Sequence, residues 1–172
     1  NVCSGWCSQV HTEIHENNLY EEALKSELQS VDLIIFTIGN SDTQLKFNRL
    51  LRELDCKIPV FFVWLEAGGR YSHILTVNYA KQGCFECLYT NADGKLVNNR
   101  AMLNTEAQLE SGLVRNGCGG TRAAYGTSVL LRTVSVLLNI MQKLFSGEIN
   151  DNTLIDITPD TVPYPDHIIP ME

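Results

Sequence analysis

Two continuous apolar segments constrain the fold of this sequence most. Residues 31–40 (VDLIIFTIGN) and 58–67 (IPVFFVWLEA) show no alternation between polar and apolar positions. Such runs are typical of strands that helices cover on both faces, as in a parallel sheet. Residues 43–54 between them predict a helix, for which Ser41 or Asp42 is the expected cap. Its apolar stripe comprises Leu45, Leu50, Leu51 and Leu54.

The flanking segments extend this pattern. Residues 9–15 predict a short strand and residues 19–29 an amphipathic helix. After Gly68 and Gly69, residues 71–80 alternate, which predicts an antiparallel strand paired with its predecessor across a glycine turn. The order of strands and helices predicts an α/β fold. We expect a doubly wound, mostly parallel sheet with an antiparallel extension.

A long polar excursion follows the predicted sheet. Residues 83–120 are rich in Asn and Gly, and only a short helix near 105–110 is expected there. Loops this long in compact domains are usually functional or mobile. Residues 148–172 hold four of the five prolines and several acidic residues. They predict an extended tail after the folded part, residues 1–147.

One strongly apolar helix is predicted before this tail, over residues 127–145. Because it is apolar nearly all round, we expect it to be buried. Thr127 or Ser128 is the expected cap, and Gly147 supplies the C-terminal stop. No window of about 18 uninterrupted apolar residues occurs, so we expect no transmembrane helix.

The charge balance and the cysteine count exclude several classes of protein. The chain of 172 residues has 13 basic and 20 acidic residues and a net charge of −7. Nucleic-acid binders normally carry a basic field, so no nucleic-acid partner is expected. The first residues, NVCSGWC, lack the features of a secretory signal. Six cysteines are too few for a disulfide scaffold and suit a reducing cytoplasm.

The sequence lacks the loops that bind nucleotide phosphates. Neither GxGxxG nor GxxxxGK[ST] occurs, although open parallel sheets usually bind nucleotides through such a loop after the first strand. The cluster of Gly117, Gly119 and Gly120 does not follow a predicted strand in a βαβ unit. We therefore expect half of a nucleotide-binding domain, without its first strand–loop–helix unit.

Cys118 is the leading candidate for catalysis. It stands in residues 116–120 (NGCGG), ahead of the long helix. Small neighbours leave a thiol open to a bulky partner, while Arg115, Arg122 and the helix N-terminus favour the thiolate. A thiolate is the nucleophile needed for thioester transfer. The alternatives are a glycine-rich turn whose cysteine only packs, or a cysteine of a metal site.

Cys84 and Cys87, in the sequence CFEC, form half of a candidate metal site. Two sulfurs at this spacing can hold one tetrahedral zinc ion, but structural zinc has four ligands. The candidate complement is Cys3 and Cys7, whose three-residue spacing is less usual. The alternative interpretation is a pair of unliganded thiols beside a strand.

Polar residues follow the first apolar strand. Residues 39–42 (GNSD) stand at the expected carboxyl edge of the sheet, where ligands bind in open α/β folds. A turn followed by a helix cap is the simpler interpretation of these residues. Trp64, Glu66 and His73 are expected to converge at the same edge. His73 is interpreted as a core residue whose hydrogen bonds are satisfied.

In their order and spacing these residues resemble the ubiquitin-activating-enzyme-like superfamily, the fold of the ThiF and MoeB proteins. The features that carry the resemblance are VDLIIFTIGN, Phe47-Asn48 in the next helix, PVFFVWLEA, GCFECLY and NGCGGTRAAYG. Within this superfamily the chain is most similar to the activating domain of bacterial fusions with a conjugating domain, which act in cyclic-oligonucleotide antiphage defence. The resemblance covers most of residues 10–147.

The resemblance implies an adenylating enzyme. With ATP and magnesium, such a domain adenylates the C-terminal carboxylate of a ubiquitin-like partner, or of a protein with such a tail. It then transfers the acyl group to a cysteine as a thioester. In that scheme Cys118 is the thioester cysteine, and Gly39, Asn40 and Asn48 border the adenylate. Homodimers are also implied, with the partner's tail over the carboxyl edge of the sheet.

The chain departs from the family pattern at three places. Gly39-Asn40 stands where many relatives have Asp-Asn, so the magnesium-binding aspartate is not matched and Asp42 is out of register. Relatives with zinc generally carry a second CxxC near the last helix, where only Cys118 stands. The ATP loop is absent, so we expect the C-terminal part of a longer enzyme. The alternatives are a non-catalytic module that docks the partner and a zinc-stabilised dimerisation module.

Overall fold

The computed structural model describes most of the chain after residue 30. The described residues are 25, 26, 28, 30–91, 93–95, 100–115, 121–159 and 169–170. The chain divides into two units, residues 1–30 and 31–172. In the first unit Lys25 and Ser26 are helical, within the helix predicted over 19–29. The strand predicted over 9–15 lies outside the described residues, and all the described strands belong to the second unit.

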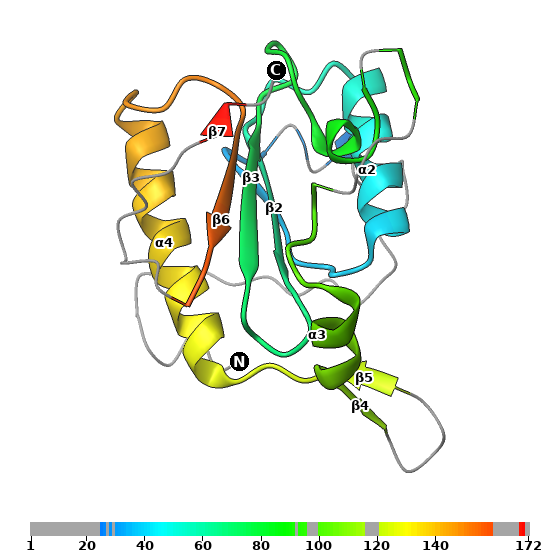
Figure 1. Ribbon diagram of the computed structural model, residues 1–172. Helices are drawn as coiled ribbons and strands as arrows, with labels where there is room; N and C mark the ends of the chain where they lie inside the picture. The colour runs from blue at the N-terminus through cyan, green and yellow to red at the C-terminus, as the bar shows by residue number, and fades with distance from the viewer. Residues whose placement is uncertain are drawn as a thin grey trace. The chain divides into compact units, whose positions relative to one another are not determined.

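A mixed β-sheet with the strand order β1-β2-β3-β6-β7 forms the centre of this unit (Figure 1). The strands are β1 (Ile34–Phe36), β2 (Val60–Leu65), β3 (Ser72–Val77), β6 (Thr153–Ile157) and β7 (Ile169–Pro170). β1 and β2 are parallel, whereas the other neighbouring pairs are antiparallel. The predicted α/β class is confirmed, but among the described strands the sheet is mixed rather than mostly parallel.

Helices cover both faces of the sheet (Figure 1). On one face α4 (Thr127–Phe145) packs against a cluster that includes Phe61. On the other face Phe62 lies 5.2 Å from Phe36 and 4.7 Å from Phe85, between ring centroids. Phe36 in turn stacks on Phe47 of α2 (Ser41–Glu53). Successive residues of β2 therefore face opposite helical layers, which explains its continuous apolar sequence.

β3 pairs antiparallel with β2 across the predicted glycine turn, with Trp64 opposite His73. All six of its residues are buried, because β6 covers its second edge and helices cover both faces. The alternation in its sequence therefore does not mark a solvent face. Its polar residues have partners instead: Ser72 Oγ lies 2.7 Å from Thr133 Oγ1 of α4. β6 comes from the segment predicted as a tail and lies inside the sheet.

β1 is shorter and more exposed than the sequence predicts. Of residues 31–40 only Ile34–Phe36 form a strand, and the side chain of Ile35 is 39% exposed. Among the described strands β1 pairs only with β2. It is thus an edge strand of the described sheet, with apolar side chains at Val31, Ile35 and Ile38 partly in solvent.

α2 uses a different cap and a different buried face from those predicted. Asn40 is the cap, and its Oδ1 accepts a hydrogen bond from Thr43 N at 2.9 Å. The fully buried positions are Gln44, Asn48 and Leu51, whereas three of the four predicted stripe residues are only partly buried. The prediction missed this face because two of its three members are polar.

α4 is only half buried, which corrects the prediction of burial all round. Its buried residues are Val129, Thr133, Val136 and Ile140. Its outer face leaves Leu131 64% exposed and Phe145 61% exposed. Gly126 occupies the cap position without a side-chain bond, and Gly147, with φ of 78°, follows the helix end as predicted. By length and composition α4 would also suit a membrane span, and its inner side packs against the core cluster of this domain.

The polar excursion contains short elements. They are the 3-10 helix η2 (Phe85–Leu88), α3 (Glu106–Ser111), and the paired strands β4 (Leu113–Arg115) and β5 (Thr121–Ala123). The short helix expected near 105–110 is confirmed. β4 and β5 are antiparallel and form a sheet separate from the main one.

Candidate functional site

A cavity of about 210 Å³ lies at the carboxyl ends of the parallel strands β1 and β2. Gly39, Ser41 and Gln44 line it from the β1–α2 connection and the first turn of α2. Trp64 and Glu66 line it from the end of β2. Open α/β sheets bind their ligands at this edge, so the cavity has the position of a binding site.

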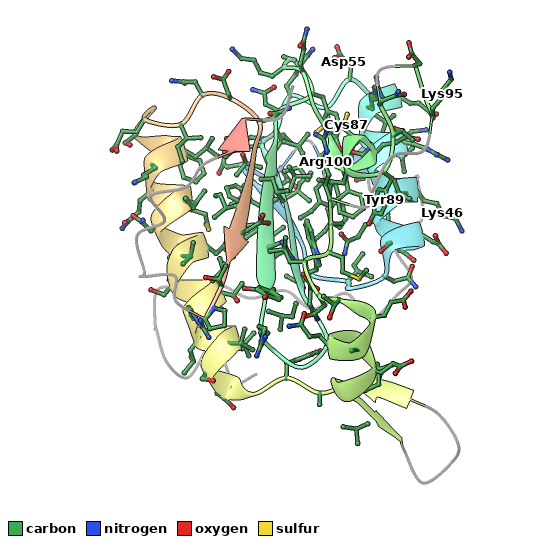
Figure 2. All side chains as sticks on the ribbon, viewed as in Figure 1. Lys46, Asp55, Cys87, Tyr89, Lys95 and Arg100 are labelled. Atoms are coloured by element: carbon green, nitrogen blue, oxygen red, sulfur yellow. The ribbon has the colours of Figure 1, made fainter. Side chains whose placement is uncertain are left out.

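The excursion between β3 and α4 supplies the other wall of the cavity. Phe85 and Tyr89 come from η2 and the residue after it, and Ala101 and Met102 come from the segment before α3. Figure 2 shows Cys87 and Tyr89 beside α2, whereas Lys46 points from α2 away from the sheet. The wall is therefore largely aromatic and apolar.

Gln44 is the polar residue of the cavity that lacks a partner. Its side chain is 1% exposed, and no hydrogen-bond partner for Oε1 is present in the described part of the chain. Leaving a buried acceptor unpaired is unfavourable, so native proteins rarely do so. A donor from a bound molecule would satisfy this oxygen.

Glu66 and Trp64 hold the segment that forms the outer wall. Glu66 Oε1 accepts a hydrogen bond from Leu103 N at 2.7 Å, and Oε2 accepts one from Asn104 N at 2.8 Å. Trp64 Nε1 donates to the carbonyl oxygen of Ala101 at 2.9 Å. We call residues 101–104 the strap, because the end of β2 fixes its backbone at three points.

His73 lies between two carboxylates under the strap. Its Nε2 is 2.7 Å from Glu66 Oε1, and its Nδ1 is 2.7 Å from Asp156 Oδ1. Burial alone would lower the pKa of His73, but hydrogen bonds to Asp156 and Glu66 and their charges outweigh it and raise the pKa. The imidazole is therefore stabilised in its charged form, and the prediction of a satisfied core histidine is confirmed.

The pKa of Glu66 shifts in the opposite direction. Burial alone would raise it, but the hydrogen bonds from His73, Leu103 N and Asn104 N lower it below its ordinary value. Glu66 is thus an ionised carboxylate whose two oxygens are already bonded. Its role in the described structure is to join β3 and the strap to β2.

Cys84 and Cys87 lie side by side at the start of η2. Their Sγ atoms are 3.7 Å apart, and the backbone N of Cys84 donates to Cys87 Sγ at 3.3 Å. Zinc–sulfur bonds of about 2.3 Å place two sulfurs of a tetrahedral site about 3.8 Å apart. The pair therefore fits one edge of a zinc tetrahedron. No third Cys, His, Asp or Glu completes a metal group among the described residues.

Asn48 supports this cysteine pair rather than the cavity. Its Nδ2 donates to Cys84 Sγ at 3.6 Å, and its Oδ1 accepts from Phe85 N and from Tyr79 Oη, both at 3.2 Å. Asn48 is fully buried, and its partners lie in the segment after β3 and at the start of η2. It was predicted to lie near the adenylate, but its described contacts are those of an anchor for η2.

The β4–β5 pair is attached beside the cavity. Gly68 N donates to Ala124 O at 2.7 Å, and Ala124 N donates to Gly112 O at 2.8 Å. Gly112 lies so close to the β2–β3 turn that a Cβ atom there would be 2.4 Å from Gly68 N. Arg115 is opposite Thr121 in the pair, and residues 116–120 connect them.

Several predicted site residues lie outside the described residues: Cys118, Cys3 and Cys7. Of the described ones, Gly39 lines the cavity, Asn40 caps α2 and Asn48 anchors η2. Sequence reasoning missed Gln44 and the Glu66 bonds to the strap. Only the position of Gln44, one helical turn before Asn48 on the same face, signalled a buried role.

In comparisons with known proteins, no protein-family model and no curated protein matches this chain.

Proposed function

We propose that this chain is the C-terminal part of an ATP-dependent activating enzyme of the ubiquitin-activating-enzyme-like superfamily. In this proposal the fold is part of a doubly wound sheet, and the protein is cytoplasmic. The enzyme joins the C-terminal carboxylate of a ubiquitin-like partner, or of a protein with such a tail, to AMP with release of pyrophosphate. Cys118 then attacks the acyl carbon, AMP leaves, and a thioester forms.

One observation supports the proposal most: the cavity at the carboxyl ends of β1 and β2, with the attachment point of β4 and β5 on its rim. Ala67 lines the cavity, and the next residue, Gly68, is bonded to Ala124 after β5. Residues 116–120, which include Cys118, connect β4 to β5. A tail bound in the cavity would thus lie on the same side of the domain as the base of this connection.

The unpaired edge of β1 supports the proposal that a nucleotide-binding unit belongs beside it. Its second edge has no partner among the described strands, and Ile35 beside it is partly exposed. Exposed apolar edges are normally covered in native proteins. In our proposal the unit that binds ATP and magnesium continues the sheet across this edge, from a part of the protein that is not in this sequence.

Mass spectrometry of the full-length protein tests the proposed chemistry. The protein is incubated with ATP, magnesium and a synthetic tail peptide that has a free C-terminal carboxylate. We expect an adduct at Cys118 that thiols remove and that the Cys118→Ala variant lacks. The matched control is the same peptide with a C-terminal amide, which cannot be adenylated. An adduct that persists in Cys118→Ala would show that the assignment is wrong.

A second candidate function is a zinc-stabilised dimerisation module without chemistry of its own. The observation that favours it is the exposed apolar face of α4 together with the Cys84–Cys87 pair. Leu131, Val134, Leu138 and Phe145 on this face are exposed and follow one another at steps of three, four and seven residues, whereas Met141 packs against the core cluster. This heptad spacing is typical of a helix that packs against another helix. We propose a second copy of the chain as its partner in either case.

A further inference from the structure

We infer that the cavity at the carboxyl edge is a subsite for one large apolar side chain of the partner's tail. Gln44 Oε1 accepts a backbone N–H from the same tail. This inference rests on the proposed function and adds to it the class of tail that the site accepts.

The volume of the cavity sets the size of the group. An engineered protein cavity of about 150 Å³ with an apolar lining takes up benzene. The cavity here, about 210 Å³, is larger than that. It therefore has room for a phenylalanine or leucine side chain, and a glycine-only tail would leave it unfilled.

The lining sets the polarity of the group. Trp64, Phe85, Tyr89 and Met102 are the aromatic and thioether residues of the lining, and Ser41, Gln44 and Glu66 are its polar residues. The one carboxylate, Glu66, already accepts hydrogen bonds from Leu103 N, Asn104 N and His73. Only one acceptor site, on Oε2, is left, and the charge of Glu66 is offset by the neighbouring His73 imidazole, so Glu66 selects a lysine or arginine side chain weakly. An uncharged apolar group fits the aromatic side of this lining.

Gln44 supplies the polar contact that would orient the tail. Gln44 lines the cavity from the α2 side, and its buried Oε1 is an unpaired acceptor among the described residues. A peptide backbone offers one N–H per residue, at a fixed distance from its side chain. A tail whose side chain enters the cavity thus brings a donor close to α2. Backbone contacts combined with a side-chain pocket are a common way of recognising extended peptides.

Calorimetric titration of the full-length protein with three synthetic N-acetylated tetrapeptides tests the subsite. Their sequences are Gly-Gly-Phe-Gly, Gly-Gly-Leu-Gly and Gly-Gly-Gly-Gly, each with a free carboxylate. Burial of the apolar side chain should make the Phe and Leu peptides bind about tenfold tighter, or more, than the Gly peptide. Equal affinities of the three peptides would overturn the inference. Tighter binding of a Gly-Gly-Lys-Gly peptide would overturn it too.

Two variants separate the pocket from the polar contact. Met102 lines the cavity and is 38% exposed, so Met102→Trp should fill the space without disturbing the core. We expect the preference for Phe over Gly to fall to about onefold. Gln44→Met keeps the side-chain length but lacks the acceptor. It should weaken all three peptides by about fivefold and leave their ratio intact. Thermal unfolding of both variants verifies that they fold.

ATP–pyrophosphate exchange with the same peptides separates this inference from the proposed function. If all peptides bind equally and all support exchange, the subsite is wrong and the activating function stands. If the Phe peptide binds tightly but no peptide supports exchange, the cavity binds tails as inferred and the activating function is wrong.

Discussion

Trp64 and His73 stack across the β2–β3 pair, with ring centroids 4.8 Å apart and ring planes 20° from parallel. The stack leaves both imidazole nitrogens at the ring edge, where they meet Glu66 and Asp156. It also holds the indole N–H toward the carbonyl oxygen of Ala101. Side chains from three neighbouring strands thereby fix one wall of the cavity.

The stability of the protein should depend on pH through His73 and Glu66. The pKa of His73 is raised on folding. Its contribution to the free energy of unfolding is therefore complete below its ordinary pKa of about 6.5, and it is lost as pH rises through the raised value. The pKa of Glu66 is lowered, so its contribution is complete above about 4.5 and is lost as pH falls through the lowered value. We expect maximal stability between about pH 5 and 6, measured by urea unfolding at a series of pH values.

The variant His73→Gln tests whether the histidine causes the loss of stability at alkaline pH. It removes the cation between two carboxylates, which at pH 6 should cost about 3–5 kcal/mol of unfolding free energy. From pH 6 to 9 the variant should then lose less stability than the wild type. Parallel losses in the two proteins would mean that another group titrates.

Replacing Glu66 with glutamine should release the strap. An amide offers one acceptor where the carboxylate offers two, so either Leu103 N or Asn104 N loses its partner. We expect a loss of about 1–3 kcal/mol and faster hydrogen–deuterium exchange at these two amides. Glu106→Gln on the exposed surface of α3 is the matched control and should leave their exchange unchanged. Unchanged exchange in Glu66→Gln would show that the carboxylate does not hold the strap.

Gly112 should not tolerate even one added methyl group. A Cβ atom there would lie 2.4 Å from Gly68 N and 2.5 Å from the carbonyl carbon of Ala67, and neither backbone can move freely. We expect Gly112→Ala to cost about 1–3 kcal/mol in thermal unfolding. Gly126→Ser is the control, because its φ of −86° is ordinary and its nearest contact is 3.8 Å away. Equal stability of the two variants would contradict the close approach.

The Cys84–Cys87 pair predicts bound zinc. Elemental analysis of protein purified without chelators should find about one zinc ion per chain, because the sulfur separation fits a zinc tetrahedron. Cys84→Ser and Cys87→Ser should each lose the metal. Cys56→Ser should retain it, since Cys56 forms no metal group with the pair among the described residues and its Sγ bonds to Ile58 O. Wild-type protein without zinc would remove the metal site from the proposal.

The sequence predicts the central strands well because their continuous apolar residues indicate burial directly. Val60–Leu65 and its pairing with Ser72–Val77 follow from apolar residues and a glycine turn. The same reasoning fails for α2. Gln44 and Asn48 are buried, although polar residues in a helix are expected to be exposed. Their burial depends on the cavity and on η2, which come from more than 35 residues away. Such contacts are set by tertiary packing and leave no local signal.

The same limit applies to α4 in the opposite sense. An apolar sequence predicts burial, but the described structure covers only the side that carries Val136 and Ile140. The sequence shows that a helix face is apolar, but it does not show which part of the protein, or which partner, packs against that face. The outer face is therefore expected to find its partner outside the described contacts.

A dimer through the outer face of α4 predicts sensitivity to charge at its centre. Leu138 is 55% exposed and lies in the middle of the heptad series from Leu131 to Phe145. We expect the wild-type protein to be dimeric in light scattering coupled to size-exclusion chromatography, and Leu138→Lys to be monomeric, because two like charges would meet in the seam. Ser135→Lys, on the same helix but outside the series, should remain dimeric. Since Leu138 is exposed in the single chain, its replacement should change the unfolding free energy of a monomer by no more than about 0.5 kcal/mol. A monomeric wild type at high concentration would rule out the second copy as the partner of this face.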